Sequence, residues 1–204
     1  MIQNNTNQLP VVEEFYTLQG EGFYTGTAAY FVRLAGCDVG CNWCDSKPSW
    51  QSFPYQMIET QELAQRIINN PSKHLVLTGG EPFLHDLTLL TSIIKKHGII
   101  THIETSGTSN YSGDWNWISL SPKPWQPPLL DFYDKAHELK VIIQTPDDFK
   151  WAEECALKVS KNCQLFLQPE WSVFNKIIPL IVEYIKTHTQ WRISIQSHKF
   201  MKIP

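Results

Sequence analysis

Two patterns of apolar residues alternate along the chain. Short runs rich in β-branched and aromatic residues predict strands over residues 27–35, 74–78, 99–104, 117–120, 139–143, 164–168 and 192–196. Apolar residues at helical spacing predict helices over residues 60–69, 86–98, 146–159 and 174–186. Alternating strands and helices form a parallel sheet with helical crossovers. Because the proline-rich segment 121–138 has little helical period, we expect an α/β fold, an incomplete (βα) barrel with parallel strands.

Composition narrows the class of protein. No internal repeat, low-complexity tract or linker divides the chain, so we expect a single domain over residues 1–204. The formal net charge of −3 argues against a nucleic-acid partner, because proteins that bind nucleic acid usually present a basic face to the phosphates. Residues 1–10 lack the features of a signal peptide, and the aliphatic run 177–182 is too short for a membrane span. We therefore expect a cytoplasmic protein with no membrane partner.

Three of the five cysteines, Cys37, Cys41 and Cys44, stand within eight residues directly after the first predicted strand. Their clustering and the odd total argue against a disulfide scaffold. Three thiolates on one short loop can hold a [4Fe–4S] cluster with one iron left open for a ligand. Spacing alone leaves two alternatives, a zinc site completed by a distant histidine and unligated thiols. Cys155 and Cys163 match no ligand position, and we expect both to be plain thiols.

A second motif, Thr78-Gly79-Gly80-Glu81-Pro82, lies where a predicted strand ends and a helix is due to begin. Paired glycines let the backbone approach a ligand closely, and a carboxylate there can receive an ammonium group. Ligands of α/β sheets and barrels bind at the carboxyl ends of the strands. An ordinary strand-to-helix turn is the alternative, and the two glycines alone would favour it.

Together, the pattern CxxxCxWC and the later GGEP resemble the radical SAM superfamily. The resemblance implies that the three cysteines bind three irons, while the fourth iron chelates the methionine part of S-adenosylmethionine. It also implies that Trp43 lies near the adenine and that the glycine turn contacts the methionine amino group. Reductive cleavage of S-adenosylmethionine would then give a 5′-deoxyadenosyl radical. A bulky residue at Gly80 is expected to block S-adenosylmethionine and to spare the cluster.

Further motifs spread over nearly the whole chain. They are FYTLQGEG at 15–22, Arg33, CDS at 44–46, SPK at 121–123, ELKV at 138–141, QP at 168–169 and the ending from QSHK at 196–199. In this order they resemble the 7-carboxy-7-deazaguanine synthase family of queuosine biosynthesis. That family converts 6-carboxy-5,6,7,8-tetrahydropterin to 7-carboxy-7-deazaguanine with release of ammonia. The resemblance implies Mg²⁺, a homodimer with a trimmed barrel and a reducing electron donor such as a flavodoxin.

The resemblance also distributes roles among individual residues. Those expected to bind S-adenosylmethionine are Trp43, Gly80, Glu81, Glu104, Ser121, Pro122, Lys123, Gln168, Pro169, Glu170 and Trp171. Those expected to hold the pterin are Leu18, Gln19, Gly20, Glu21, Arg33, Thr78, His198 and Pro204, the last through its terminal carboxylate. Ser46 is expected to ligate Mg²⁺, where the family usually has threonine; serine keeps the hydroxyl oxygen that a hard cation prefers.

Residue chemistry alone is less decisive at two of these positions. Arg33 can pair with a carboxylate in a bidentate way, but charged residues are mostly exposed, and a strand-edge ion pair is the ordinary alternative. His198 could equally be a solvated residue of the tail. Two other functions also compete: a glycyl-radical activase, which is a radical SAM enzyme acting on a protein, and a non-catalytic zinc or electron-carrying module.

Overall fold

Nine strands form one curved sheet in the computed structural model, which describes residues 7–51 and 55–204. The strand order is β3-β1-β2-β4-β5-β6-β7-β8-β9. Their bounds are β1 (Gln8–Leu18), β2 (Ala28–Leu34), β3 (Gln56–Glu59), β4 (His74–Gly79), β5 (Ile100–Thr105), β6 (Trp117–Leu120), β7 (Glu138–Ile143), β8 (Gln164–Pro169) and β9 (Trp191–Ile193). From β2 onward the pairings are parallel, whereas β1 pairs antiparallel with β2 and β3. Because β3 and β9 remain edges, the barrel is incomplete, which confirms the predicted fold class.

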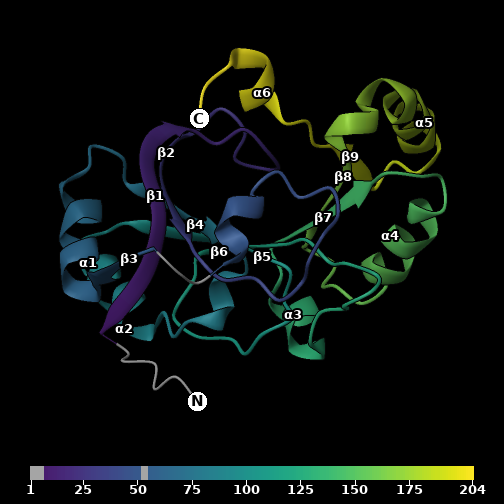
Figure 1. Ribbon diagram of the computed structural model, residues 1–204. Helices are drawn as coiled ribbons and strands as arrows, with labels where there is room; N and C mark the ends of the chain where they lie inside the picture. Colours follow the sequence, from purple (N-terminus) through teal and green to yellow (C-terminus); the bar gives the residue numbers. More distant parts are fainter. Residues whose placement is uncertain (1–6, 52–54) are drawn as a thin grey trace.

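Helices cover the outer face of this sheet. Figure 1 shows α1 and α2 on one flank, α4 and α5 on the other, and α6 with the C-terminal segment above the strands. Their bounds are α1 (Thr60–Asn69), α2 (Thr88–Lys95), α3 (Leu130–Lys135), α4 (Asp148–Ala156), α5 (Phe174–Thr187) and α6 (Ser197–Met201), with 3₁₀ turns η1 (Lys47–Trp50), η2 (Pro82–Leu84) and η3 (Trp171–Val173). No helix in the described ranges is both long and apolar enough to cross a bilayer.

Strand β7 shows how the sequence separates core from cavity. Leu139, Val141 and Ile143 belong to the hydrophobic core beneath the helices. The alternate residues Glu138 and Lys140 are also buried, but they face the inside of the barrel, since successive side chains of a strand point to opposite faces. The strand therefore carries its apolar face outward to the helices and its charged face inward.

The predicted elements differ from the observed ones mainly near the N-terminus. Strand β1 was not predicted, because a bulge between Val11 and Glu13 shifts its register and breaks the alternation of apolar and polar residues. The four-residue strand β3 and the six-residue helix α3 are too short to show a clear period. The predicted helices 86–98 and 146–159 form, but only over the shorter ranges of α2 and α4.

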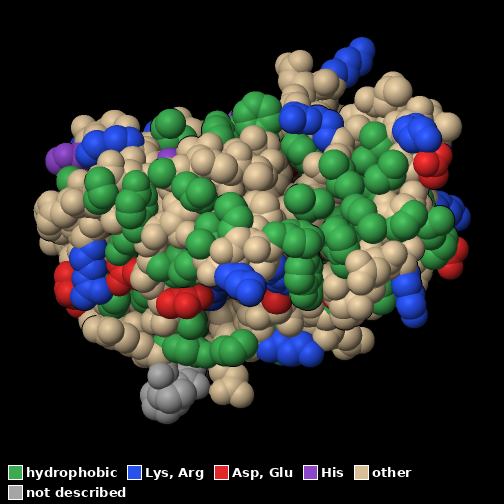
Figure 2. Space-filling model, turned by 90° about the horizontal axis from the view of Figure 1, so that it is seen from above, with side chains coloured by type: hydrophobic (Ala, Val, Ile, Leu, Met, Phe, Trp, Pro, Cys, Tyr) green, Lys and Arg blue, Asp and Glu red, His purple; other side chains and the backbone are tan. Residues whose placement is uncertain are grey.

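One face of the molecule is seen in Figure 2, which looks down on the side where α6 and the C-terminal segment lie in Figure 1. Hydrophobic side chains are spread over much of this face, and basic and acidic side chains are interspersed among them. The charges are therefore not separated by sign into one large patch on this face.

Candidate active site

A cavity of about 420 Å³ opens at the carboxyl ends of the parallel strands. Every residue predicted for the site lines it except Glu81 and Pro122. Residues that lie far apart in sequence, such as Gln19, Cys37 and His198, therefore share one space. The cavity is also lined by residues that received no predicted role: Phe15, Phe31, Val39, Asp45, Trp50, Gly79, Thr105, Ser106, Ser119, Lys140, Ile142, Gln196 and Lys199.

The cysteine loop forms one wall of this cavity, and backbone hydrogen bonds tie it to η1. The Cys37 amide donates to the Trp50 carbonyl at 3.2 Å, and the Cys44 amide donates to the Cys41 carbonyl at 3.0 Å. The Trp50 indole and the Ser46 amide both donate to the Cys44 sulfur at 3.4 Å. Hydrogen bonds of this kind stabilise a metal-bound thiolate, so the surroundings of Cys44 fit a cluster ligand.

Burial raises the pKa of both Cys37 and Cys41. Binding of a metal would remove their protons, because a coordinated thiol is deprotonated. Within the described ranges, no three cysteine, histidine or carboxylate side chains stand together as a ready metal-binding group. The donor chemistry nevertheless fits an iron–sulfur cluster, because three cysteines on one short loop line the same cavity.

The glycine turn packs directly against the start of the cysteine loop. The Gly80 amide donates to the Leu34 carbonyl at 3.1 Å, and the Glu81 amide donates to the Gly36 carbonyl at 2.8 Å. A Cβ atom at Gly80 would collide with the Gly36 carbonyl oxygen and would lie 2.7 Å from the Cys37 Cβ. Only glycine allows this approach of two backbone segments.

The Glu81 carboxylate does not reach the cavity. Its side chain is 0% exposed and accepts hydrogen bonds from the Thr105 hydroxyl at 2.6 Å and the Ser106 amide at 2.8 Å, and also from the Ser106 hydroxyl. It further accepts from the Phe83 amide at 3.1 Å. Burial raises the pKa of Glu81, while these four donors favour its ionised form. The turn therefore presents its glycine backbone to the cavity, and the glutamate ties β4 to the end of β5. Pro122 does not line the cavity either, and its side chain is buried.

Lys123 and Trp43 lie together on the side of the cavity next to the cysteines. The Lys123 ammonium lies 5.5 Å from the centre of the Trp43 ring and donates to the Ser121 hydroxyl at 2.8 Å. Burial lowers the pKa of Lys123. Trp43 also meets Trp125 edge to face, with 6.2 Å between the ring centres. This aromatic and cationic corner suits a nucleoside whose ring stacks and whose polar groups accept hydrogen bonds.

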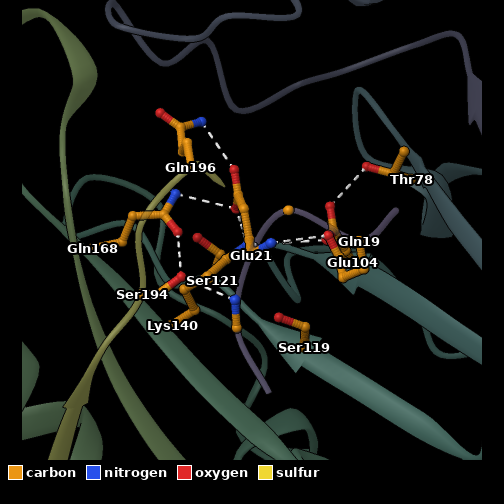
Figure 3. Close-up of polar contacts among 12 residues, drawn as sticks. Gln19, Glu21, Thr78, Glu104, Ser119, Ser121, Lys140, Gln168, Ser194 and Gln196 are labelled. Atoms are coloured by element: carbon orange, nitrogen blue, oxygen red, sulfur yellow. Dashed lines mark hydrogen bonds and ion pairs between the residues drawn. The ribbon is translucent and has the colours of Figure 1, made fainter. Parts of the chain in front are cut away.

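The floor of the cavity holds a buried lysine between two carboxylates (Figure 3). Lys140 is 5% exposed, forms an ion pair with Glu21 and lies 4.0 Å from Glu104. The Gln168 amide donates to Glu21 at 3.1 Å, and the Gln196 amide donates to the same carboxylate at 2.9 Å. No role was predicted for Lys140 or Gln196 from the sequence, yet both contact Glu21, a residue predicted to bind the substrate.

Glu104 lies among residues predicted for the pterin, although its own predicted ligand was S-adenosylmethionine. It accepts hydrogen bonds from the Gln19 amide at 3.0 Å and from the Thr78 hydroxyl at 3.2 Å. Glu104 therefore lies where the two predicted sites meet. Together with Glu21 it forms the acidic floor of the cavity.

Arg33 and Ser46 contact each other at the cavity wall. Arg33 donates from Nη1 to the Ser46 hydroxyl at 2.9 Å and from Nε to Glu13 at 2.7 Å. The strand-edge ion pair that we considered as the alternative for Arg33 is thus present with Glu13, yet the guanidinium also lines the cavity. Ser46 places its hydroxyl at the same wall, within reach of a ligand that Arg33 would hold.

The C-terminal segment closes the cavity from above. The Ser197 amide donates to the Gly20 carbonyl at 2.9 Å, and His198 packs against Gly20 so closely that a Cβ there would collide with its ring. Lys199 forms an ion pair with Asp45 at 3.0 Å. Burial alone would raise the pKa of Asp45, but Lys199 and Gln196 bring it below its ordinary value. The tail is therefore fastened both to the loop after β1 and to the cysteine loop.

The fold and the cysteine loop define a radical SAM protein. The sequence model described as the radical SAM superfamily matches residues 32–153, which contain both the cysteine loop and the glycine turn. A crystal structure of QueE from Escherichia coli matches with a TM-score of 0.85 at 33% identity, covering 94% of this chain and 95% of that one.

Relatives of known name narrow the class further. A 7-carboxy-7-deazaguanine synthase of Flavobacterium psychrophilum is 49% identical, covering 96% of this chain and 93% of that protein. Proteins of the same name from Synechocystis and Escherichia coli are 43% and 32% identical, covering 97% and 96% of this chain and 95% and 99% of their own lengths. The chain belongs to the 7-carboxy-7-deazaguanine synthase family, as its motifs predicted.

Proposed function

We propose that this chain converts 6-carboxy-5,6,7,8-tetrahydropterin to 7-carboxy-7-deazaguanine with release of ammonia, a step of queuosine biosynthesis. The observation that carries the proposal is the single cavity shared by the cysteine loop, the acidic floor and Arg33. The 5′-deoxyadenosyl radical that the cluster and S-adenosylmethionine would supply beside the cysteine loop would share this space with a small carboxylated ligand. A cavity of about 420 Å³ suits such a ligand better than the protein substrate of an activase.

Each wall of the cavity has its own part in this reaction. Cys37, Cys41 and Cys44 hold the [4Fe–4S] cluster, which together with S-adenosylmethionine supplies one-electron cleavage to a carbon radical. The nucleoside corner at Trp43 and Lys123 orients S-adenosylmethionine, and the remaining residues predicted for that ligand complete the same side. The protein's main task is to align one C–H bond of the substrate with the radical and to exclude competing reactions.

The substrate is held by groups that match its edges. Arg33 pairs with the carboxylate, because a guanidinium binds carboxylates through charge-assisted hydrogen bonds. The acidic floor, Glu21 and Glu104, accepts hydrogen bonds from the amino and ring N–H groups. Phe15 and Phe31 stack with 5.2 Å between their ring centres and give the wall an apolar surface for the planar pyrimidinone ring. His198 and Pro204 cover the ligand from the tail.

Several broader properties belong to the same proposal. A flavodoxin-like protein would supply the electron, the enzyme would work as a homodimer in the cytoplasm, and residues 1–204 would form one catalytic domain. The family resemblance supports the electron donor and the homodimer, whereas the sequence features described above support the location and the single domain.

The proposed reaction is tested with anaerobically reconstituted protein, S-adenosylmethionine, a chemical reductant, Mg²⁺ and the tetrahydropterin. We expect the product and ammonia to appear in equal amounts, and the protein to show a broad visible absorption that bleaches on reduction. Colourless protein, or cleavage of S-adenosylmethionine with no loss of the pterin, would refute the proposal.

Replacing Arg33 by alanine is expected to weaken binding of the substrate. Loss of a charge-assisted hydrogen bond costs about 1.5–3 kcal/mol, or roughly ten- to a hundredfold in affinity. The measurement is KM for the pterin, with the rate of uncoupled S-adenosylmethionine cleavage as the check that the cluster is intact. Because Arg33 also pairs with Glu13, the matched control is Glu13→Gln, which removes that ion pair only. Equal KM values in wild type and Arg33→Ala would leave Arg33 without a role in binding.

Replacing Ser46 by alanine is expected to lower turnover and to remove its dependence on Mg²⁺, while the iron–sulfur spectrum stays unchanged. A hard cation prefers oxygen ligands, and the variant has no side-chain oxygen at this position. Ser46→Thr, which keeps the hydroxyl, should retain the Mg²⁺ response. Full, Mg²⁺-responsive activity in Ser46→Ala would show that other groups hold the metal.

A further inference from the structure

The burial of Lys140 in the cavity floor needs a special explanation. A buried ammonium is costly unless carboxylates compensate it, and three of them face this one: Glu21 from the loop after β1, Glu104 from β5 and Glu138 from β7. Burial alone would lower the pKa of Lys140, but these carboxylates hold it well above its ordinary value. The lysine is therefore charged and sits among an excess of negative charge.

Glu138 interacts with the lysine through its charge but has hydrogen-bond partners of its own. It accepts hydrogen bonds from the Phe23 amide at 2.9 Å, the Ser119 hydroxyl at 3.1 Å and the Trp117 indole at 3.3 Å. It does not line the cavity. The two carboxylates that meet both the ammonium and the cavity are therefore Glu21 and Glu104.

The amides around Glu21 are fixed so that they donate to it. The Gln168 oxygen accepts from the Ser194 hydroxyl at 2.7 Å, which in turn accepts from the Gly22 amide at 2.9 Å. The Gln168 nitrogen must then point toward Glu21, as Figure 3 shows. Gln196 donates to the other oxygen of the same carboxylate.

The arrangement at Glu104 is equivalent. The Gln19 oxygen accepts from the Glu21 amide at 3.1 Å, which turns the Gln19 nitrogen toward Glu104. Thr78 donates to the second oxygen. A carboxylate can accept about four hydrogen bonds, and these two donors leave acceptor capacity that faces the cavity. The side-chain hydrogen-bond partners of both carboxylates are donors, so the two carboxylates present acceptor oxygens to the cavity.

We infer that Lys140 is a positioning and specificity-determining residue: its ammonium holds Glu21 and Glu104 in place, so that the floor selects a ligand edge made of N–H donors. The inference rests on the proposed function, in which that edge is the aminopyrimidinone side of the pterin. The Lys140 charge also reaches Lys123 and His102: burial lowers the pKa of both side chains, and the Lys140 ammonium lowers each of them further. Without the ammonium, the two carboxylates would repel each other across the floor and would lose the positions in which both accept from the ligand. The floor would then distinguish less sharply between a donor and an acceptor on the ligand.

The test is a binding measurement that needs no reductant and no turnover. Pterin-6-carboxylate and lumazine-6-carboxylate differ only at positions 1 and 2 of the pyrimidine ring: lumazine carries a 2-carbonyl acceptor and N1–H where pterin carries the 2-amino donor and an unprotonated N1. We expect the wild-type protein to bind the pterin at least about tenfold more tightly, the size of one charge-assisted hydrogen bond. In Lys140→Met the pterin should bind about tenfold more weakly, and the preference should fall to within about threefold. The matched control is Lys95→Met, which breaks the surface ion pair with Asp114 and should keep the preference.

Glu104→Gln and the double variant separate specific from structural effects. Glu104→Gln should lower the preference by itself, because an amide also donates, and it keeps the inference testable if Lys140→Met does not fold. The two changes together should cost less than the sum of the single changes, since one charge of each sign is removed. An unchanged preference in either single variant, additive losses in the double variant, or no preference in the wild type would overturn the inference. If the binding preference behaves as expected but the tetrahydropterin is not turned over, the proposed reaction is refuted and the inference about Lys140 stands.

Discussion

Replacement of Cys37, Cys41 or Cys44 by alanine is expected to abolish cleavage of S-adenosylmethionine. Each of the three thiolates holds an iron, and a [4Fe–4S] cluster with two protein ligands lacks the anchoring that this chemistry requires. The two remaining cysteines cannot replace a lost ligand, because neither Cys155 nor Cys163 lines the cavity. The measurements are iron content after anaerobic reconstitution and formation of 5′-deoxyadenosine.

The matched controls for this prediction are Cys155→Ala and Cys163→Ala. Cys155 is packed in the core, with its sulfur 3.9 Å from the Tyr133 hydroxyl, and burial raises its pKa to about 11. Cys163 is buried as well, and burial raises its pKa to about 12. Both are inert thiols, so both variants should keep the iron content and the cleavage rate of the wild type. Loss of iron in either control would mean that the cluster depends on cysteines outside the loop.

An element of this fold could be predicted from the sequence when the interactions that determine its conformation are local. The parallel strands β4 to β8 were predicted because their apolar runs are fully buried and need no partner to be recognised. Strand β1 was not predicted, because its bulge disturbs the alternation of apolar and polar residues. Helix α3 was not predicted, because its six residues are too few to show a helical period. In both elements the tertiary partner, not the local pattern, decides the conformation.

The residues of the candidate site divide in the same way, into those found from local motifs and those placed by tertiary contacts. Cys37 and Gly80 belong to short motifs whose spacing is visible in the sequence, and both line the cavity. The Glu81 carboxylate was predicted to face a ligand, yet it is satisfied by the end of β5, a contact that no local pattern reveals. Lys140 received no role, although a usable signal existed. Glu138 and Lys140 stand two residues apart in an otherwise apolar strand, and two charges on one face of a buried strand imply a polar interior.

Replacement of Gly80 by alanine is expected to have nearly as large an effect as loss of a cysteine. A single methyl group there would collide with the Gly36 carbonyl oxygen and the Cys37 Cβ. The turn cannot retreat, because its amides are hydrogen-bonded to the Leu34 and Gly36 carbonyls. Overpacking of this kind costs about 1–3 kcal/mol, and here the strain falls on the residue that begins the cysteine loop.

The structure therefore changes what a bulky residue at Gly80 should do. Sequence reasoning expected Gly80→Val to block S-adenosylmethionine and to spare the cluster, whereas the contact with Cys37 implies that the cluster is disturbed too. We expect Gly80→Ala to lower the iron content after reconstitution and the rate of 5′-deoxyadenosine formation together, by tenfold or more on the basis of that strain. The matched control is Gly40→Asn in the same loop, where φ is 65° and a Cβ meets nothing within 4 Å. Asparagine tolerates this left-handed conformation, so the control should keep its iron. A Gly80→Ala protein with full iron content but no binding of S-adenosylmethionine would instead support the simpler role of Gly80 as a ligand contact.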